Sequence, residues 1–292
     1  MSVLTLPKAG SARQRRIGLA LVVLATIVWS TAGLFARVVE LDSWTILFWR
    51  GIFGATTGLS YLLWQKGGET LPSFRRMGWP DMAFSLSAAL AMLAFFAALK
   101  HTSVAHVSII YATVPFVTAL LAWAVVREAA SAATMAASFI ALAGVTLMLG
   151  WGAGEGHLSG DILSFLMTAL MGVMIVIGRA YISAFIVERC VLAALFSSLL
   201  SLPFATPLAA SSFDVTAIAL FGAAHMGLGM IVFGYGAQMI PASESALLGA
   251  LETPLAPFWV WAVFGDIPGI ATIVGGTIVL CAVCGHVLWE SR

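Results

Sequence analysis

The stretch ASESALLGALETPLAPFWVWA, residues 242–262, runs in register with SVAHVSIIYATVPFVTALLAW, residues 103–123, when Pro254 is placed on Pro115. Both stretches are predominantly apolar and have the length, about 20 residues, that a helix needs to cross the hydrocarbon core of a bilayer. The later one carries Glu252 in its middle. An ionisable group at that depth is costly unless it has a partner or faces water, so Glu252 is a candidate functional residue.

The composition of the whole chain agrees with these two stretches. Of 292 residues, 61% are hydrophobic and 9% are charged, whereas a soluble domain carries about 25% charged residues. The sequence therefore predicts an all-α integral membrane protein. The net charge of +1 does not point to nucleic acid, so the expected partners are the bilayer and a small-molecule substrate. Cys190, Cys281 and Cys284 lie in apolar runs and are interpreted as packing residues.

Ten apolar runs are long enough to be transmembrane helices, and the loops between them are short. With ten crossings, both termini lie on one side of the membrane. We expect the spans at residues 17–37, 44–64, 80–99, 104–126, 130–150, 160–181, 188–206, 214–237, 243–264 and 268–289.

Basic residues near the span ends indicate which side that is, because cytoplasmic loops are enriched in Lys and Arg. If the N-terminus is cytoplasmic, the opposite side holds only Arg37 and Lys100. Both termini are therefore predicted to be cytoplasmic. The cytoplasmic residues are then Lys8, Arg13, Arg15, Arg16, Lys66, Arg75, Arg76, Arg127, Arg179, Arg189 and Arg292.

The repeat extends beyond the two opening stretches. Earlier in the chain the offset is 142 residues, which places Thr26 on Thr168 and Arg37 on Arg179. Each half, 17–150 and 160–289, then holds five spans. Because five is odd, the second half enters the membrane from the opposite side, giving an inverted repeat. This construction is frequent in secondary transporters, where the substrate site lies near the bilayer midplane between the repeats.

The chain resembles the drug/metabolite transporter superfamily, in the ten-helix branch built from two EamA-type repeats. The resemblance covers nearly all of the chain and is carried by VWSTAGLFAR (28–37), FWRG (48–51), YATVPF (111–116) and LETPLAPFWVWAVFGD (251–266). The family usually ends the fourth helix of a repeat with Gly-Glu, where this chain has Arg127-Glu128 and Gly265-Asp266. The resemblance is greatest to bacterial exporters of aromatic amino acids, which implies a multi-pass protein of the inner membrane.

Candidate binding residues cluster on the fourth and ninth spans. Glu252, with Thr253 beside it, is either a structural carboxylate or a group that contacts a substrate amine or exchanges a proton. The repeat places Thr113 opposite Glu252. His106 precedes Thr113 by two helical turns and is expected on the same face, although a lone histidine is more often structural.

Pro115 and Pro254 are expected to break their helices midway along the spans. Breaks at equivalent sites of two inverted halves indicate the binding region. They would free the carbonyls of Tyr111 and Ala250 to accept hydrogen bonds from a substrate. A kink with a purely structural role is the alternative.

Arg50 is the other charge inside a span. It is expected to pin its helix to a neighbour, to pair with Glu252 or to hold a substrate carboxylate. Trp29, with Ser30 beside it, and Tyr111 are expected to line the cavity wall. A cavity of flat aromatic rings with few polar groups suits an aromatic amino acid, or a flat organic cation with Glu252 as its counter-charge.

These features predict a secondary transporter that uses alternating access, not an enzyme. The sequence has no Walker-type phosphate loop for ATP hydrolysis, and no constellation that implies a metal or another cofactor. An intramembrane enzyme and a receptor are remote alternatives, and a channel differs from a transporter in its kinetics. The sequence leaves the oligomeric state open, with a monomer as one option.

Overall fold

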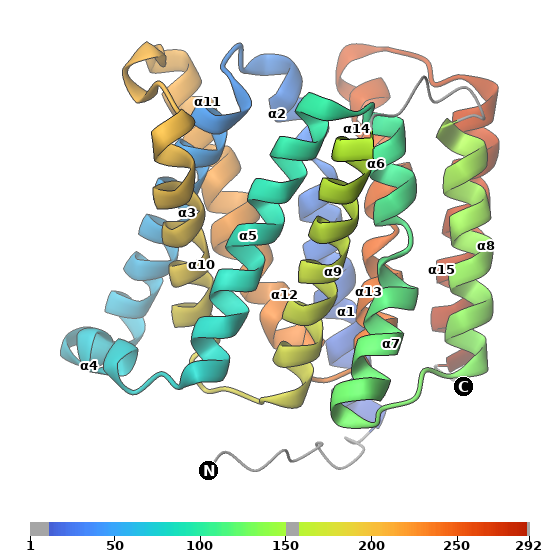
Figure 1. The fold of residues 1–292 in the computed structure, drawn as a ribbon, viewed down its shortest axis with the longest axis horizontal. Helices are drawn as coiled ribbons and strands as arrows, with labels where there is room; N and C mark the ends of the chain where they lie inside the picture. Colours follow the sequence, from blue (N-terminus) through green and yellow to red (C-terminus); the bar gives the residue numbers. More distant parts are fainter. Residues whose placement is uncertain (1–11, 150–157, 291–292) are drawn as a thin grey trace.

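The computed structural model describes residues 12–149 and 158–290, so Lys8, Arg292 and the predicted end of the fifth span at residue 150 lie outside it. The described residues form a bundle of helices without strands (Figure 1). The α-helices are α1 (Ala12–Ser30), α2 (Ala32–Val38), α3 (Ser43–Lys66), α4 (Thr70–Arg75), α5 (Trp79–His101), α6 (Val104–Tyr111), α7 (Val114–Val126), α8 (Ala132–Leu149), α9 (Leu158–Ala180), α10 (Ile186–Ser201), α11 (Ser212–Gly222), α12 (Met230–Ala237), α13 (Ala242–Gly249), α14 (Glu252–Phe264) and α15 (Ile270–Glu290). A π-helix, η4 (Ala223–Gly229), joins α11 to α12.

Nine helical segments of the described chain are long and apolar enough to cross a membrane. They correspond to nine of the ten predicted spans and confirm an all-helical, multi-pass membrane protein over the described residues. The predicted span at 44–64 corresponds to α3, which has 24 residues and runs from one end of the bundle to the other (Figure 1). It is less apolar than the nine because it carries Arg50 and several Ser and Thr residues, so the tenth crossing stays a prediction.

Helices that the predicted repeat makes equivalent run in opposite directions through the bundle (Figure 1). Helix α1 begins, and α15 ends, at the lower end of the bundle as drawn in Figure 1. Helix α9, the counterpart of α1 in the second half, begins at the upper end. Helices α3 and α10, the second long helices of the two halves, likewise run opposite to each other.

Contacts between the halves join counterparts. Helix α3 packs against α10, α8 against α15, and α7 against α13, so that second, fifth and fourth helices meet their own equivalents. First and third helices meet crosswise, α1 against α12 and α9 against α5. The halves are thus interleaved through the whole bundle and do not form two separate units.

Polar and apolar residues are distributed as expected for a protein surrounded by lipid. Large apolar side chains such as Leu120, Phe139 and Leu220 are exposed on the outer surface, while Thr26, Ser85 and other polar residues are buried. A soluble protein rarely exposes so much contiguous apolar surface. Lipid tails would cover this surface, and the small buried residues let the helices approach closely.

Helix α3, which carries Arg50, has a well-defined start. Asp42 caps it, because the Asp42 carboxylate accepts hydrogen bonds from the backbone N–H groups of Trp44 and Thr45. Burial on its own would raise the pKa of this carboxyl group. The hydrogen bonds from Thr45, Trp44 and Thr206 outweigh it and leave the pKa below its ordinary value.

Close packing of α3 against α10 depends on Gly51. A Cβ atom at this position would lie 2.6 Å from the backbone oxygen of Ala194. Gly51→Ala is therefore expected to destabilise the protein by about 1–3 kcal/mol, the usual effect of overpacking a tight contact. Thermal unfolding of the purified protein in detergent measures it. Gly285→Ala is the matched control, since nothing lies within 4 Å of its Cβ position; equal unfolding temperatures for the two variants would contradict the packing.

Candidate functional site

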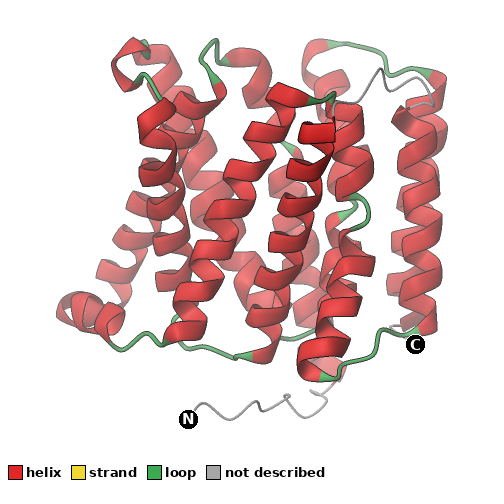
Figure 2. Ribbon diagram, viewed as in Figure 1, coloured by secondary structure: helices red, strands yellow, loops and turns green. Residues whose placement is uncertain are grey.

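Two spans are interrupted midway, at points that the predicted repeat makes equivalent. Helix α6 gives way to α7 at residues 112–113, and α13 gives way to α14 at residues 250–251. Figure 2 shows the first break as a loop between two helical segments. Pro115 lies in the first turn of α7 and Pro254 in the first turn of α14, and both are buried. Neither proline has an N–H group to continue the helical hydrogen-bond ladder.

The two breaks leave different backbone groups free. Among the described residues, no backbone N–H donates a hydrogen bond to the carbonyl of Tyr111. The carbonyl of Ala250 accepts one from Thr253 N at 3.3 Å. The expectation of two freed carbonyls is therefore wrong at Ala250, because the chain forms a short turn there before α14 begins. Of the two, only the Tyr111 carbonyl stays available as an acceptor.

Arg50 is buried, with 7% of its surface exposed. Its Nη2 donates to the Sδ atom of Met92 at 3.0 Å, and thioether sulfur is a weak acceptor. The guanidinium lies over the rings of Phe96 and Phe221, at 5.8 and 5.3 Å from their centroids. The buried Nε atom has no hydrogen-bond partner. No carboxylate of the described residues forms an ion pair with Arg50, so the predicted pairing with Glu252 is not formed in this conformation.

Glu252 is the first residue of α14 and is only partly exposed. No hydrogen bond or ion pair to its carboxylate occurs within the described residues. Arg50 and Tyr111 both lie within electrostatic reach of it. The start of a helix carries partial positive charge, which favours a carboxylate at this position. The break thus places a carboxyl group in the interior without a hydrogen-bond or ion-pair partner among the described residues.

Trp29 and Ser30 lie in a hydrogen-bonded cluster beside a further break in the first span. The indole Nε1 of Trp29 donates to the backbone oxygen of His225 at 3.1 Å, and its ring packs at 5.0 Å from that of Phe233. The hydroxyl of Ser30 accepts a hydrogen bond from Trp259 Nε1 at 2.8 Å. These bonds hold the two predicted cavity residues against the second half of the chain.

The structure separates His106 from Thr113. The Nδ1 atom of His106 lies 3.2 Å from Asp161 Oδ1, at the start of α9. Thr113 falls in the break after α6, and its hydroxyl donates to the carbonyl of Ile110 at 2.6 Å. The expectation that they share one helical face is wrong, because the helix does not continue through residues 112–113. Thr253 lies beside Glu252, and its hydroxyl has no hydrogen bond within the described residues.

Two ion pairs join the halves reciprocally, one at each end of the bundle. Arg37 pairs with Asp266 at the upper end, and Arg179 pairs with Glu128 at the lower end. Each arginine lies near the end of the first span of one half. Each acid follows the left-handed residue that ends the fourth span of the other half, which is Gly265 or Arg127. We call these pairs the upper latch (Arg37–Asp266) and the lower latch (Arg179–Glu128).

The two latches differ in strength. The side chains of the upper latch are 51% and 50% exposed, those of the lower latch 12% and 15%. In the lower latch, Arg179 also donates to the carbonyl of Gln238 at 3.1 Å, and Glu128 accepts from the N–H of Ala242 at 3.0 Å. Exposed ion pairs contribute about 0–1 kcal/mol, whereas hydrogen bonds to charged groups contribute about 1.5–3 kcal/mol each. The lower end is therefore held more firmly in this conformation.

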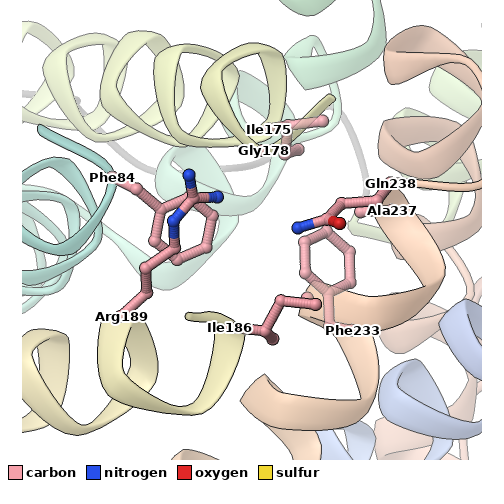
Figure 3. A pocket seen from close by; sticks show the side chains of 9 residues that line it. Phe84, Ile175, Gly178, Ile186, Arg189, Phe233, Ala237 and Gln238 are labelled. Carbon is pink, nitrogen blue, oxygen red and sulfur yellow. The ribbon is translucent and has the colours of Figure 1, made fainter. Parts of the chain in front are cut away.

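Further buried ion pairs lie at the lower end. Arg189 Nε donates to Asp81, and Arg189 Nη2 to the carbonyl of Tyr181. A narrow hollow adjoins this pair between α5, α9, α10 and α12. Figure 3 shows Arg189 and Phe84 on one side of it and Gln238 and Phe233 on the other. The hollow lies apart from Arg50 and Glu252, so it is not the central site.

His225 makes a contact across the bundle that the sequence does not indicate. This residue lies in the π-helix η4, is buried, and its Nε2 is 3.0 Å from the hydroxyl of Thr31. A π-helical turn often accompanies a functional site, but a glycine-rich run without proline gives no clear signal for one. Sequence reasoning used Arg179 and Arg189 only as cytoplasmic charges near span ends and did not foresee that both pair with acids.

The fold is that of a multi-pass helical membrane protein over the described residues. The EamA-like transporter family model matches residues 16–150, so the first half of this chain is similar to an EamA-like transporter domain. No curated protein matches the chain. A solved chain described as "Crystal structure of protein" aligns with a TM-score of 0.81 and 18% identity, covering 98% of this chain and 100% of that one. At that identity the likeness concerns the fold.

Proposed function

We propose that this chain is a secondary transporter of small amphipathic metabolites in the bacterial inner membrane, and that it exports aromatic amino acids. The observation that carries the proposal is the presence of two ionisable groups of opposite charge, Arg50 and Glu252, that have no ion-pair partner among the described residues. Ionisable groups at membrane depth mark substrate paths. Glu252 also adjoins a helix break, as binding groups do in transporters built from inverted repeats.

The proposed architecture is ten crossings in two inverted repeats, residues 17–150 and 160–289, with both termini in the cytoplasm. Three observations support it: counterpart helices run in opposite directions, contacts join counterparts across the halves, and the latches are reciprocal. In this arrangement the substrate site lies between the halves. Breaking one latch while the other holds would open one end of the path at a time.

The residues proposed to line the site differ in how directly the geometry supports them. Arg50 and Tyr111, on two other helices, each lie within electrostatic reach of Glu252. Trp29, Ser30, Thr113 and Thr253 lie on or beside the breaks. His106 is the weakest candidate, because Asp161 already pairs with it. A second candidate substrate, a flat organic cation, is favoured by the partnerless carboxylate of Glu252.

Uptake into proteoliposomes of the purified protein tests the proposal. Labelled tryptophan, phenylalanine, threonine and a flat organic cation are supplied, with and without a pH gradient. We expect saturable uptake of tryptophan and phenylalanine, each competing with the other. Uptake by the Glu252→Gln variant is then measured with and without the gradient. The comparison with the wild-type protein distinguishes a role of Glu252 in proton coupling from a role in substrate binding. A monodisperse, correctly inserted protein that moves none of these solutes would show that the proposed substrate class is wrong.

A further inference from the structure

The centre of the bundle holds a cation that lacks an anion. Arg50 is almost fully buried, its Nε atom has no partner, and the only acceptor of its side chain within the described residues is the sulfur of Met92. A buried charge is normally paired with an opposite charge, since removal from water is costly. The rings of Phe96 and Phe221 offset part of this cost through cation–π contacts. They leave the Nε atom of the guanidinium without a hydrogen-bond partner.

Glu252 is a carboxyl group that likewise has no ion-pair partner among the described residues. Glu252 is within electrostatic reach of Arg50, yet no nitrogen of Arg50 lies within 4.0 Å of its carboxylate. A direct ion pair would satisfy both groups. The fold instead holds them on separate helices, α3 and α14, with each fixed by its own neighbours: Arg50 by the ring contacts, and Glu252 by its place at the break. Two opposite charges held near each other but unbonded are complementary to a ligand that carries both charges itself.

Resting on the proposed function, we propose that Arg50 and Glu252 form a two-point site for the zwitterionic head of an α-amino acid, with the substrate carboxylate on Arg50 and the substrate ammonium on Glu252. Guanidinium matches a carboxylate with two parallel hydrogen bonds. A bound zwitterion pairs both buried charges and leaves the site neutral. A cation without a carboxylate leaves Arg50 unpaired, and an anion without an ammonium leaves Glu252 unpaired. Arg50 thus selects amino acids over organic cations.

Three indole compounds with the same ring test the two points separately: tryptophan, tryptamine and indole-3-propionate. Binding of each labelled compound is measured directly on purified protein by scintillation proximity, so the result does not depend on transport. The wild-type protein is expected to bind tryptophan about 10- to 100-fold more tightly than the other two, the range for losing one charged hydrogen-bonding partner.

Two charge-neutralising variants are then expected to lose two different binding preferences. Arg50→Gln is expected to lose the preference for tryptophan over tryptamine, and Glu252→Gln the preference for tryptophan over indole-3-propionate. Arg50→Lys, which keeps the charge but not the fork of donors, is expected to retain discrimination against tryptamine with weaker binding. Retained thermal unfolding temperatures show that each variant is folded.

The outcomes separate this inference from the proposed function. Equal binding of tryptophan and tryptamine by the wild-type protein would overturn the two-point site while leaving aromatic transport intact. The two-point site would also be overturned if Arg50→Gln weakened the binding of all three compounds by the same factor. A uniform loss is what the removal of a structural arginine would produce. If the folded wild-type protein binds no indole compound, the proposed function and the two-point site both fail.

Discussion

Arg189→Met is expected to lower the free energy of unfolding by about 3–5 kcal/mol, the usual result of removing one partner of a buried ion pair. The side chains of Arg189 and Asp81 are 3% and 8% exposed. Asp81 also accepts hydrogen bonds from Ser183 Oγ and from the N–H of Gly78, both at 2.8 Å. Without the arginine, a buried carboxylate keeps these two donors but loses its counter-charge. Thermal unfolding in detergent measures the change.

An exposed ion pair in the same protein provides the control. Arg76 and Glu69 pair at 2.8 Å with side chains that are 62% and 66% exposed. Glu69→Gln is therefore expected to change stability by less than about 1 kcal/mol. The double variant Asp81→Asn/Arg189→Met, which leaves no isolated charge, is expected to recover part of the loss. An unfolding temperature for Arg189→Met close to that of the wild type would contradict the account of the lower end.

The second large effect is expected from the latches. Glu128→Gln removes the charge of the firmer lower latch and leaves Arg179 without its carboxylate. A hydrogen bond between charged groups stabilises a conformation by about 1.5–3 kcal/mol. Removing it shifts a two-state equilibrium by roughly 10- to 150-fold. We expect the population to move toward conformations with the lower end open. Asp266→Asn acts on the exposed upper latch, so its effect is expected to be smaller and opposite in direction.

Spin-label distances report both ends in the same protein. One pair of labels is placed at Ala129 and Ile182 for the lower end, and another at Glu40 and Ile267 for the upper end; all four positions are exposed. Cys281 and Cys284, which are also exposed, are replaced by serine beforehand. Glu128→Gln is expected to lengthen the lower distance. Lengthening of both distances by either variant would indicate general loosening and would contradict the reciprocal arrangement.

Much of the fold follows from composition and proline placement. Runs of apolar residues locate the helices, because a chain in lipid has to satisfy its backbone hydrogen bonds within each helix. Pro115 and Pro254 locate two breaks, because proline removes a donor wherever it occurs. No proline marks the break at Thr31 or the π-helix at residues 223–229 in the sequence. They arise where side chains of the two halves hydrogen-bond across the bundle, as Thr31 does with His225.

The candidate site could be predicted only in part for the same reason. Glu252 and Arg50 are conspicuous as charges inside apolar runs, so their burial is readable from sequence. Their lack of a mutual ion pair is not, because it depends on how α3 and α14 are placed by their neighbours. Likewise Asp81 and Arg189 are 108 residues apart, and nothing local indicates their pairing. The spacing of His106 predicts that it lines the central site. In the structure it instead contacts Asp161 at the start of α9.

Counterflow of labelled tryptophan in proteoliposomes tests the central claim most directly. Vesicles preloaded with unlabelled tryptophan take up external labelled tryptophan transiently above equilibrium only if one carrier exposes the same site to each side in turn. We predict a saturable overshoot with the wild-type protein, its abolition by Arg50→Gln, and its persistence in Gly285→Ala. Tryptophan flux that rises linearly with concentration and shows no overshoot, or an overshoot unchanged by Arg50→Gln, would contradict transport through a central site built on Arg50 and Glu252.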